Sequence, residues 1–167
     1  MKNNIFLIGF MGAGKSSIAR TLKQQYHMRL IEMDEQIEAE QGMKISQIFS
    51  EKGEDYFRSL ETRLLEGLQQ QENTVVSCGG GVPMRRCNVD AMKKSGMIVY
   101  LSAKPETIYG RVCNSHTRPL LEGNMNVEYI TGLLKARLPK YLEAADVVVK
   151  TDGKSLQEIC RCIMEKI

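Results

Sequence analysis

The stretch at residues 9–16, Gly-Phe-Met-Gly-Ala-Gly-Lys-Ser, constrains the fold of this chain more than any other segment. It follows an apolar run at residues 5–8 and leads directly into a segment with the periodicity of an amphipathic helix. The pattern G-x-x-x-x-G-K-[ST] between a strand and a helix is typical of a loop that wraps backbone N–H groups around nucleotide phosphates. The sequence therefore predicts a strand, a phosphate-binding loop and a helix.

The residue types of this loop suit a phosphate chain. Glycines allow a close approach of the backbone to an anion, and the first turn of the following helix presents unpaired N–H groups. Lys15 supplies a full positive charge, and Ser16 supplies an oxygen ligand for a hard cation. An ordinary glycine turn is the alternative, and the complete, correctly flanked motif disfavours it. We expect the phosphates to contact Gly12, Ala13, Gly14, Lys15, Ser16 and Ser17.

Length and composition predict one globular domain covering residues 1–167. The chain is 43% apolar and 26% charged, and no apolar run approaches the roughly 20 residues that span a bilayer. Its net charge of +3 is spread along the sequence, which gives no footprint for nucleic acid. Five cysteines without metal-ligand spacing, in a chain without a secretion signal, indicate reduced thiols and a cytoplasmic location. We therefore expect neither a membrane nor a nucleic-acid partner.

Short apolar segments alternate with helical ones along the whole chain. The expected strands cover residues 5–8, 29–33, 74–78, 97–101 and 146–150. The expected helices cover residues 16–26, 34–40, 46–52, 55–71, 88–94, 106–113, 128–144 and 155–167, and Pro139 should kink or divide the helix that contains it. Such alternation predicts an α/β fold in which helices cover both faces of a five-stranded parallel sheet.

Polar residues and glycines follow two of these strands, at the sheet edge where ligands bind in open parallel sheets. Asp34 comes after the second strand and fits either a ligand contact or the N-cap of the helix at 34–40. Three consecutive glycines, Gly79, Gly80 and Gly81, follow the third strand. They fit a tight turn, but at this position they also let a substrate lie against bare backbone, which we favour. Arg58 fits a solvent-exposed or a cleft position equally well.

The periodicity lapses at residues 114–126, a stretch that includes Arg118. Irregular segments with cations are typical of surface loops that close over a bound phosphate. A phosphate loop serves both switch GTPases and small-molecule kinases, but neither N-K-x-D nor D-x-x-G occurs in the sequence. A kinase instead needs a second pocket and a lid that excludes water. Asp34, the triple glycine, Arg58 and Arg137 are candidates for that pocket.

Taken in order, the motifs of this chain resemble those of the shikimate kinase family along its whole length. The resemblance includes the loop at 9–17, the segment Met-Asp-Glu-Gln-Ile-Glu at 33–38, and Gly-Glu-x-x-Phe-Arg at 53–58. It continues with Ser-Cys-Gly-Gly-Gly at 77–81, Arg-Pro-Leu-Leu at 118–121 and Arg-x-Pro-x-Tyr at 137–141. Any one of these motifs is weak evidence, whereas the ordered set is specific.

The resemblance implies a three-layer P-loop kinase fold with a helical substrate cap at about 34–61 and a mobile lid at about 114–126. It implies transfer of the γ-phosphoryl group of ATP to the 3-hydroxyl of shikimate, a step of aromatic amino-acid synthesis, by a magnesium-dependent monomer. The implied shikimate contacts are Asp34, Arg58, Gly79, Gly80, Gly81 and Arg137. The implied catalytic residues are Lys15, Asp34 and Arg118. The resemblance also implies that Arg111 and Arg118 contact the nucleotide. Ser16 and Glu32 are the implied metal contacts, and Glu32 would act through water.

Two positions depart from the family pattern. Glu32 stands where the family usually has the first aspartate of Asp-x-Asp, and Cys78 stands where threonine is common. The longer carboxylate keeps its charge but changes its reach toward a metal. A thiol is a weaker hydrogen-bond partner than a hydroxyl. The alternatives are a related gluconate or nucleoside-monophosphate kinase, and a non-catalytic module that senses ATP.

Overall fold

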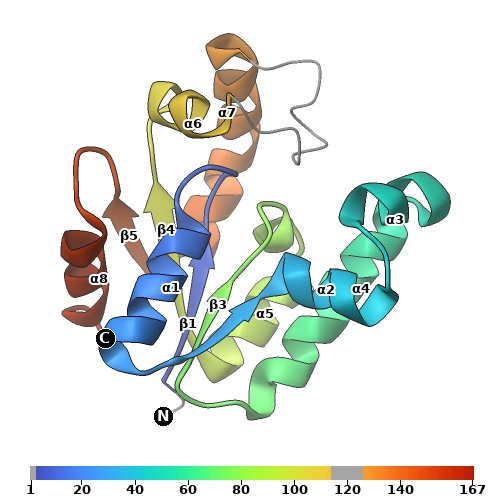
Figure 1. The fold of residues 1–167 in the computed structure, drawn as a ribbon, viewed down its shortest axis with the longest axis horizontal. Coiled ribbons are helices and arrows are strands. Elements are labelled where there is room, and N and C mark those ends of the chain that lie inside the picture. Colours follow the sequence, from blue (N-terminus) through green and yellow to red (C-terminus); the bar gives the residue numbers. More distant parts are fainter. Residues whose placement is uncertain (1–2, 114–125) are drawn as a thin grey trace.

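The computed structural model describes residues 3–113 and 126–167 and contains one parallel sheet (Figure 1). Its strand order is β2-β3-β1-β4-β5. The strands are β1 (Asn4–Ile8), β2 (Arg29–Glu32), β3 (Thr74–Ser77), β4 (Gly96–Ser102) and β5 (Val147–Lys150). All neighbouring strands pair in parallel, so the predicted five-stranded parallel sheet is confirmed.

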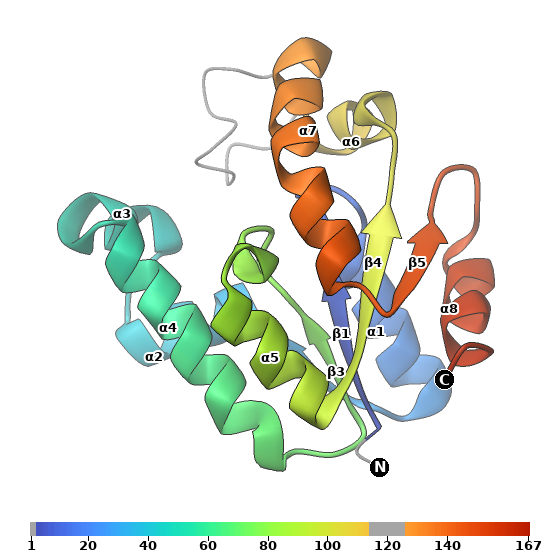
Figure 2. The same ribbon diagram turned by 180° about the vertical axis from the view of Figure 1, so that it is seen from behind.

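Helices connect these strands and cover the sheet (Figure 2). They are α1 (Lys15–Tyr26), α2 (Met33–Gln41), α3 (Ile45–Lys52), α4 (Glu54–Gly67), α5 (Arg86–Ser95), α6 (Pro105–Val112), α7 (Val127–Ala144) and α8 (Leu156–Met164). Two short 3-10 helices, η1 (Leu68–Gln70) and η2 (Val82–Met84), complete the described part of the chain. The positions of the predicted elements are confirmed to within a few residues.

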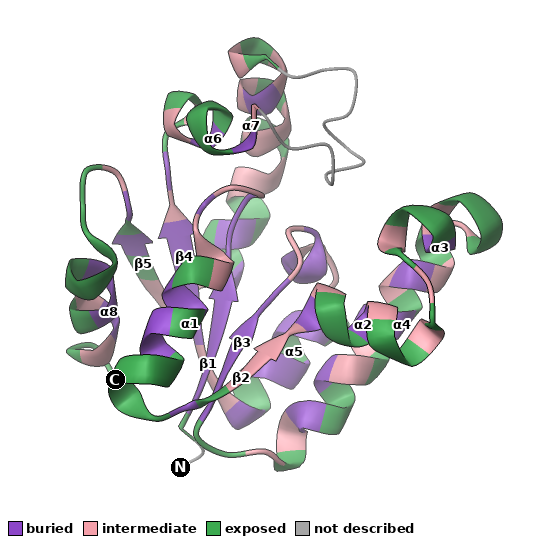
Figure 3. Ribbon diagram, viewed as in Figure 1, coloured by how far each residue is buried: buried purple, intermediate pink, exposed green. Residues whose placement is uncertain are grey.

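The central strand β1 is buried on both faces, which explains its unbroken apolar sequence. Ile5 and Leu7 pack in one cluster with residues of α1 and α8, while Phe6 and Ile8 pack in another with residues of α4, α5 and α7. Figure 3 shows the buried strands between helices whose outer faces are exposed. The two apolar clusters give the three layers of the predicted fold.

Two smaller apolar clusters lie beyond the carboxyl ends of the strands. One joins Phe10 of the phosphate loop to α6 and α7, through Ile108, Val112 and Ile130. The other joins α2, α3 and α4 through Ile37, Ile48, Phe57 and Leu60, and it coincides with the predicted helical insert at about 34–61. These clusters place a separate group of helices on each side of the same sheet edge, and the role of the insert as a substrate cap stays a prediction.

For Asp34 and for Pro139 the structure excludes one of the two alternatives that the sequence left open. Asp34 does not cap α2, because the helix begins at Met33 and its N-cap residue is Glu32. Pro139 does not divide its helix, because α7 continues from Val127 to Ala144 with Pro139 inside it. A proline removes one N–H donor, and packing on both sides of that turn sustains the helix. Among residues 3–113 and 126–167, no helix is long and apolar enough to cross a bilayer.

Candidate active site

The phosphate loop between β1 and α1 has the backbone that its glycines permit. Gly12 and Gly14 have φ angles of 79° and 96°, a region that other residues rarely occupy. Nζ of Lys15 lies over the loop and donates hydrogen bonds to the carbonyl oxygens of Gly9, at 2.6 Å, and Phe10, at 3.1 Å. The lysine charge is therefore held at the mouth of the loop.

Helix α6 packs directly against this loop. A Cβ atom on Gly12 would lie 2.6 Å from Cγ1 of Val112, so only glycine allows this contact. Arg111, at the end of the same helix, donates a hydrogen bond of 2.9 Å from Nη1 to the Gly12 carbonyl oxygen. The predicted nucleotide residue Arg111 thus lies beside the predicted phosphate loop.

Strand β2 brings the carboxylate of Glu32 to the first turn of α1. The Ser16 hydroxyl donates a 2.9 Å hydrogen bond to Oε2 of Glu32. The other oxygen, Oε1, is buried and has no hydrogen-bond partner in the described part of the chain, and the guanidinium of the exposed Arg20 is 4.0 Å from it. The structure therefore brings the two predicted metal residues together, and one buried oxygen there lacks a hydrogen bond.

The triple glycine after β3 is in close contact with charged side chains. A Cβ atom on Gly79 would lie 2.6 Å from Oε2 of Glu61, and one on Gly80 would lie 3.0 Å from Nη1 of Arg137. A Cβ atom on Gly81 would lie 2.5 Å from Nη1 of Arg58. Each glycine of this turn, residues 79–81, thus lets one ionisable group approach the backbone closely. We call this segment the glycine turn.

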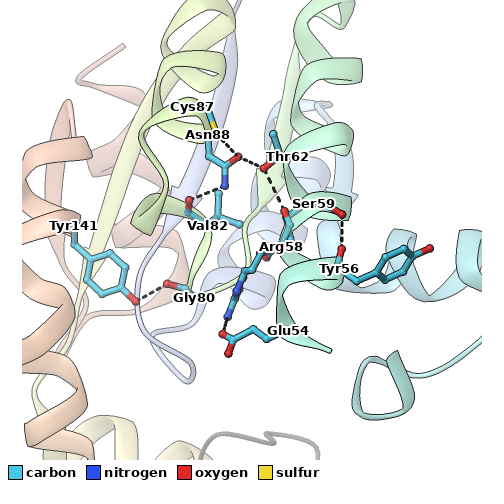
Figure 4. A network of polar contacts seen from close by, with 11 residues as sticks. Glu54, Tyr56, Arg58, Ser59, Thr62, Gly80, Val82, Cys87, Asn88 and Tyr141 are labelled. Atoms are coloured by element: carbon cyan, nitrogen blue, oxygen red, sulfur yellow. Dashed lines mark hydrogen bonds and ion pairs between the residues drawn. The ribbon is translucent and has the colours of Figure 1, made fainter. Parts of the chain in front are cut away.

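Hydrogen bonds from two helices hold the glycine turn in place (Figure 4). The Tyr141 hydroxyl of α7 donates to the Gly80 carbonyl oxygen at 2.8 Å. On the other side, the buried Asn88 of α5 donates to the Val82 carbonyl oxygen at 2.9 Å and accepts from the Thr62 hydroxyl of α4 at 2.7 Å. The turn therefore has a fixed position relative to α4, α5 and α7.

Helix α4 contributes a buried ion pair to the site. Arg58 contacts Oε1 of Glu61 at 2.8 Å and Oε1 of Glu54 at 3.1 Å, and the side chain of Glu61 is fully buried. Burial raises the pKa of Glu61 to about 7, although the Arg58 charge and hydrogen bond lower it, and the nearby Asp34 raises it further. The carboxyl group of Glu61 is therefore partly protonated near neutral pH.

Glu61 is a site residue that the sequence analysis missed. It lies three positions after Arg58 on the same helix, and residues at this spacing face each other. That spacing was the available signal, but an acidic residue within an amphipathic helix is usually exposed. Its burial depends on the glycine turn, which leaves room for a carboxylate only because Gly79 has no side chain.

The phosphate loop and the glycine turn meet at the Gly9 carbonyl oxygen. This oxygen accepts from Lys15 at 2.6 Å and would lie 3.6 Å from a Cβ atom on Gly80. Oδ1 of Asp34 would lie 3.4 Å from a Cβ atom on Gly79. The Arg137 guanidinium is 5.7 Å from the ring centre of Phe10, within cation–π range. The predicted pocket residues thus converge on the phosphate loop.

Three buried side-chain atoms lack a hydrogen-bond partner in the described part of the chain, and all belong to this site. They are Oε1 of Glu32, Oε2 of Glu61 and Nη1 of Arg137. Buried polar atoms are normally paired because each unpaired atom costs stability. Their clustering at one edge of the sheet is the arrangement expected where a polar ligand completes the hydrogen bonds.

One residue singled out in the sequence does not contribute to this geometry. The thiol of Cys78 lies 3.9 Å from the sulfur of Met92, in the apolar cluster beneath α5, and burial raises its pKa. Cys78 is therefore a core residue. Arg118 and the other lid residues at 114–125 lie outside the described residues.

A family comparison decides among the kinases that share this arrangement. The family model described as shikimate kinase matches residues 11–167 of the chain. The chain belongs to the shikimate kinase family. It is 42% identical to the shikimate kinase of Dehalococcoides mccartyi strain 195, over 100% of this chain and 94% of that protein. The prediction of a shikimate kinase from the sequence is confirmed.

Solved structures agree with this family. The shikimate kinase from Acinetobacter baumannii, solved in complex with shikimate, has a TM-score of 0.92 and 32% identity, covering 99% of this chain and 92% of that chain. A gluconokinase from Sinorhizobium meliloti 1021 has a TM-score of 0.60 and 20% identity, covering 99% of this chain and 91% of that chain. The likeness to the gluconokinase shows a shared fold alone.

The first prediction concerns Gly81. In Gly81→Ala the new methyl group would displace the Arg58 guanidinium, which is the mobile end of a side chain, so we expect the fold to survive. Binding of an acidic acceptor should weaken by about tenfold, as for the loss of one charged hydrogen bond. We expect steady-state kinetics to show this in KM for shikimate, with KM for ATP unchanged.

Gly67→Ala is the matched control. Gly67 has helical dihedral angles and no heavy atom within 4 Å of the added carbon. Its kinetics should equal those of the wild type, while its stability should rise by about 0.5–1 kcal/mol. An unchanged KM for shikimate in Gly81→Ala would show that the position of Arg58 does not matter for the acceptor.

The second prediction concerns the pH dependence of stability. The pKa of Glu61 rises from an ordinary 4.5 to about 7 on folding, so between these values the folded protein holds a proton that the unfolded chain has lost. Glu61 should therefore make the free energy of unfolding fall as pH increases from 4.5 to about 7, and level off above that. Urea unfolding between about pH 5 and about pH 8 measures this slope.

In Glu61→Gln the side chain keeps its shape and a hydrogen-bond acceptor for Arg58 but cannot titrate. Its unfolding free energy should fall less steeply over this pH interval than that of the wild type. Glu66→Gln, at an exposed position of the same helix, should keep the wild-type slope. Equal slopes in wild type and Glu61→Gln would contradict a neutral, buried Glu61.

Proposed function

We propose that this shikimate kinase transfers the γ-phosphoryl group of ATP to the 3-hydroxyl of shikimate, giving shikimate 3-phosphate and ADP. The observation that carries the proposal is the convergence of Arg58, Arg137 and Asp34 on the glycine turn, opposite the phosphate loop. The shikimate kinase that was solved with shikimate supports the same acceptor. Phosphoryl transfer requires mostly positioning and charge neutralisation, and this site has groups for both.

Arg58 and Arg137 are the proposed ligands of the shikimate carboxylate. Guanidinium groups bind carboxylates with paired hydrogen bonds, and Nη1 of Arg137 is buried with no acceptor among the residues that the structure describes. Arg58 contacts Oε1 of Glu61, and burial raises the pKa of Glu61 to about 7. A protonated Glu61 would still accept a hydrogen bond from Arg58 but would leave the Arg58 charge for the substrate. Gly79, Gly80 and Gly81 would let the ring of the acid lie against the backbone.

Asp34 is the proposed contact for the reacting hydroxyl. It lies in the first turn of α2 and faces Gly79, on the acceptor side of the phosphate loop. A carboxylate there accepts a hydrogen bond from the hydroxyl and aims its oxygen at the γ-phosphorus. A loose transition state needs little proton removal before transfer, so orientation is the main contribution of Asp34.

Lys15 and Arg118 are proposed to neutralise charge on the moving phosphoryl group. Lys15 lies at the loop mouth, within 2.6 Å of the Gly9 carbonyl that borders the glycine turn. The loop residues Gly12 to Ser17 would bind the phosphates through backbone N–H groups. Arg111, which packs beside the loop, would stack on the adenine base. Arg118 on the predicted lid would approach from the opposite side.

Ser16 and Glu32 fit a magnesium ion. Both offer hard oxygen ligands, they lie 2.9 Å apart, and Oε1 of Glu32 is buried without a hydrogen bond. Within the described residues no cluster of His, Cys, Asp and Glu could form an all-protein metal cage, and Mg²⁺ bound with ATP does not need one. When bound, the ion would neutralise the phosphate charge that develops during transfer. Glu32, through water, would hold it in place.

A panel of acceptors tests the proposed reaction and is the third prediction. A coupled assay of ADP release, with Mg²⁺ and ATP, should show turnover with shikimate and not with gluconate or nucleoside monophosphates. Those acceptors lack the pairing of one carboxylate with neighbouring ring hydroxyls that this site fits. Turnover with gluconate or a nucleoside monophosphate, and none with shikimate, would overturn the proposed function. Tight ATP binding with no product from any acceptor would favour the ATP-sensing module.

The fourth prediction concerns the metal. Glu32→Gln keeps the hydrogen bond from Ser16 but removes the negative charge. We expect the Mg²⁺ concentration for half-maximal activity to rise by about tenfold, the usual effect of losing an outer-shell metal partner. The measurement is a titration of activity with Mg²⁺ at saturating shikimate.

Glu35→Gln is the control for that titration. Glu35 is also 4.0 Å from Arg20, but its side chain is 71% exposed and it does not bond to Ser16. We expect a Mg²⁺ requirement equal to that of the wild type. If both variants change equally, the effect comes from the general loss of negative charge and Glu32 has no metal role. A cytoplasmic monomer remains the prediction for location and assembly.

A further inference from the structure

The motif at the end of α7 places two side chains on one face of that helix. Arg137 and Tyr141 are four residues apart, a spacing that brings side chains together on an α-helix. Arg137 is half-buried at the glycine turn, and Tyr141 is fully buried one turn further along. Tyr141 therefore lies in the core behind the glycine turn, and its hydroxyl is directed at that turn (Figure 4).

The hydroxyl of Tyr141 connects two parts of the acceptor pocket. It donates its proton to the Gly80 carbonyl oxygen at 2.8 Å, which leaves its lone pairs to accept. Burial raises the pKa of this phenol, and the charge of Arg137 and a hydrogen bond with its side chain oppose that rise. A Cβ atom on Gly80 would lie 3.0 Å from Nη1 of Arg137 and 3.8 Å from the Tyr141 hydroxyl oxygen, so the hydroxyl and the guanidinium lie at the same face of the glycine turn.

The ring of Tyr141 is held rigidly. It stacks on Tyr100 of β4, with the ring centres 5.1 Å apart and the planes at 22°. Both rings belong to the apolar cluster between the sheet and α5 and α7. Because β4 is paired on both sides, the position of the Tyr141 hydroxyl is tied to the sheet frame.

We propose that Tyr141 is a positioning residue, whose hydroxyl group holds the Gly80 backbone and the Arg137 guanidinium in the arrangement that binds the carboxylate of the acceptor. In this scheme the hydroxyl donates its proton to Gly80, and its oxygen accepts a hydrogen bond from the Arg137 guanidinium, whose Nη1 lies at the glycine turn. Tyr141 touches no substrate in this scheme. The inference rests on the proposed function, because it concerns the same carboxylate.

A purely structural role for Tyr141 gives a different expectation. A core aromatic ring contributes through area and packing, and phenylalanine supplies both. If the hydroxyl matters only for stability, Tyr141→Phe should change the melting temperature and leave the binding of each substrate alone. If the hydroxyl positions Arg137, the loss should appear selectively in the binding of the carboxylate.

The test compares Tyr141→Phe with Tyr100→Phe. The two tyrosines are stacked on each other and buried, and each variant removes one hydroxyl group. Burial raises the pKa of Tyr100 and a hydrogen bond with Ser102 lowers it, whereas the Tyr141 hydroxyl donates to Gly80 in the glycine turn. In steady-state kinetics, Tyr141→Phe should raise KM for shikimate by about tenfold, the usual cost of one charge-assisted hydrogen bond. KM for ATP should stay within about twofold, and Tyr100→Phe should change neither KM.

A ligand without the carboxylate provides the second measurement. Calorimetric binding of shikimate and of its analogue with a hydroxymethyl group in place of the carboxylate should separate the two roles. Tyr141→Phe should weaken shikimate binding by about tenfold and leave the affinity for the analogue unchanged. In an Arg137→Ala background the effect of Tyr141→Phe should shrink to less than about twofold, because the group being positioned is gone.

The outcomes distinguish this inference from the function on which it depends. If the wild type does not bind or phosphorylate shikimate, the proposed function fails. If the wild type does and Tyr141→Phe has the same KM for shikimate, the inference alone fails. Equal weakening of shikimate and its analogue, or an undiminished effect in the Arg137→Ala background, would also overturn it. Calorimetric titration of the folded variant gives the affinity even if its melting temperature falls.

Discussion

The site depends on the contact between charged side chains and a backbone without Cβ atoms. Three side chains, those of Glu61, Arg137 and Arg58, each have an atom within 3.0 Å of the position that a Cβ atom would take on one glycine of the turn at 79–81. They come from α4 and α7, which approach the turn from opposite sides. None of the three could take its position beside a larger residue. The sheet contributes by ending β3 at Ser77, next to β1, so the turn lies beside the phosphate loop.

This contact explains why the site keeps unpaired polar atoms. Burying a charged group is unfavourable unless hydrogen bonds and opposite charges compensate it. Arg58 and Glu61 compensate each other in part, yet one oxygen of Glu61 and one nitrogen of Arg137 have no hydrogen-bond partner among residues 3–113 and 126–167. Hydrogen bonds from Tyr141 to Gly80 and from Asn88 to Val82 hold the turn and the residue that follows it. The protein therefore maintains a polar surface that a ligand can complete.

The sequence predicted best those features that a contiguous stretch encodes. The phosphate loop, β1 and α1 form one local unit, and the pairing of Ser16 with Glu32 follows once β2 is placed beside α1.

Predictions were weaker where tertiary contacts decide the position of a side chain. Glu61 was missed because only the glycine turn makes its buried position possible. Cys78, which departs from the family pattern, follows β3 directly, and its side chain packs in the apolar core with Met92. Pro139 leaves α7 whole because the helix is packed on both sides of it.

The Gly9 carbonyl oxygen shows how the two substrates share one frame. It belongs to the phosphate loop, accepts a hydrogen bond from Lys15, and borders Gly80 on the acceptor side. A shift of the glycine turn would therefore move the acceptor relative to the lysine that neutralises the phosphoryl group. A misplacement of about 1 Å is enough to slow a transfer that relies on positioning. The rigid attachment of the turn to α5 and α7 is thus as much a part of the reaction geometry as the charged groups themselves.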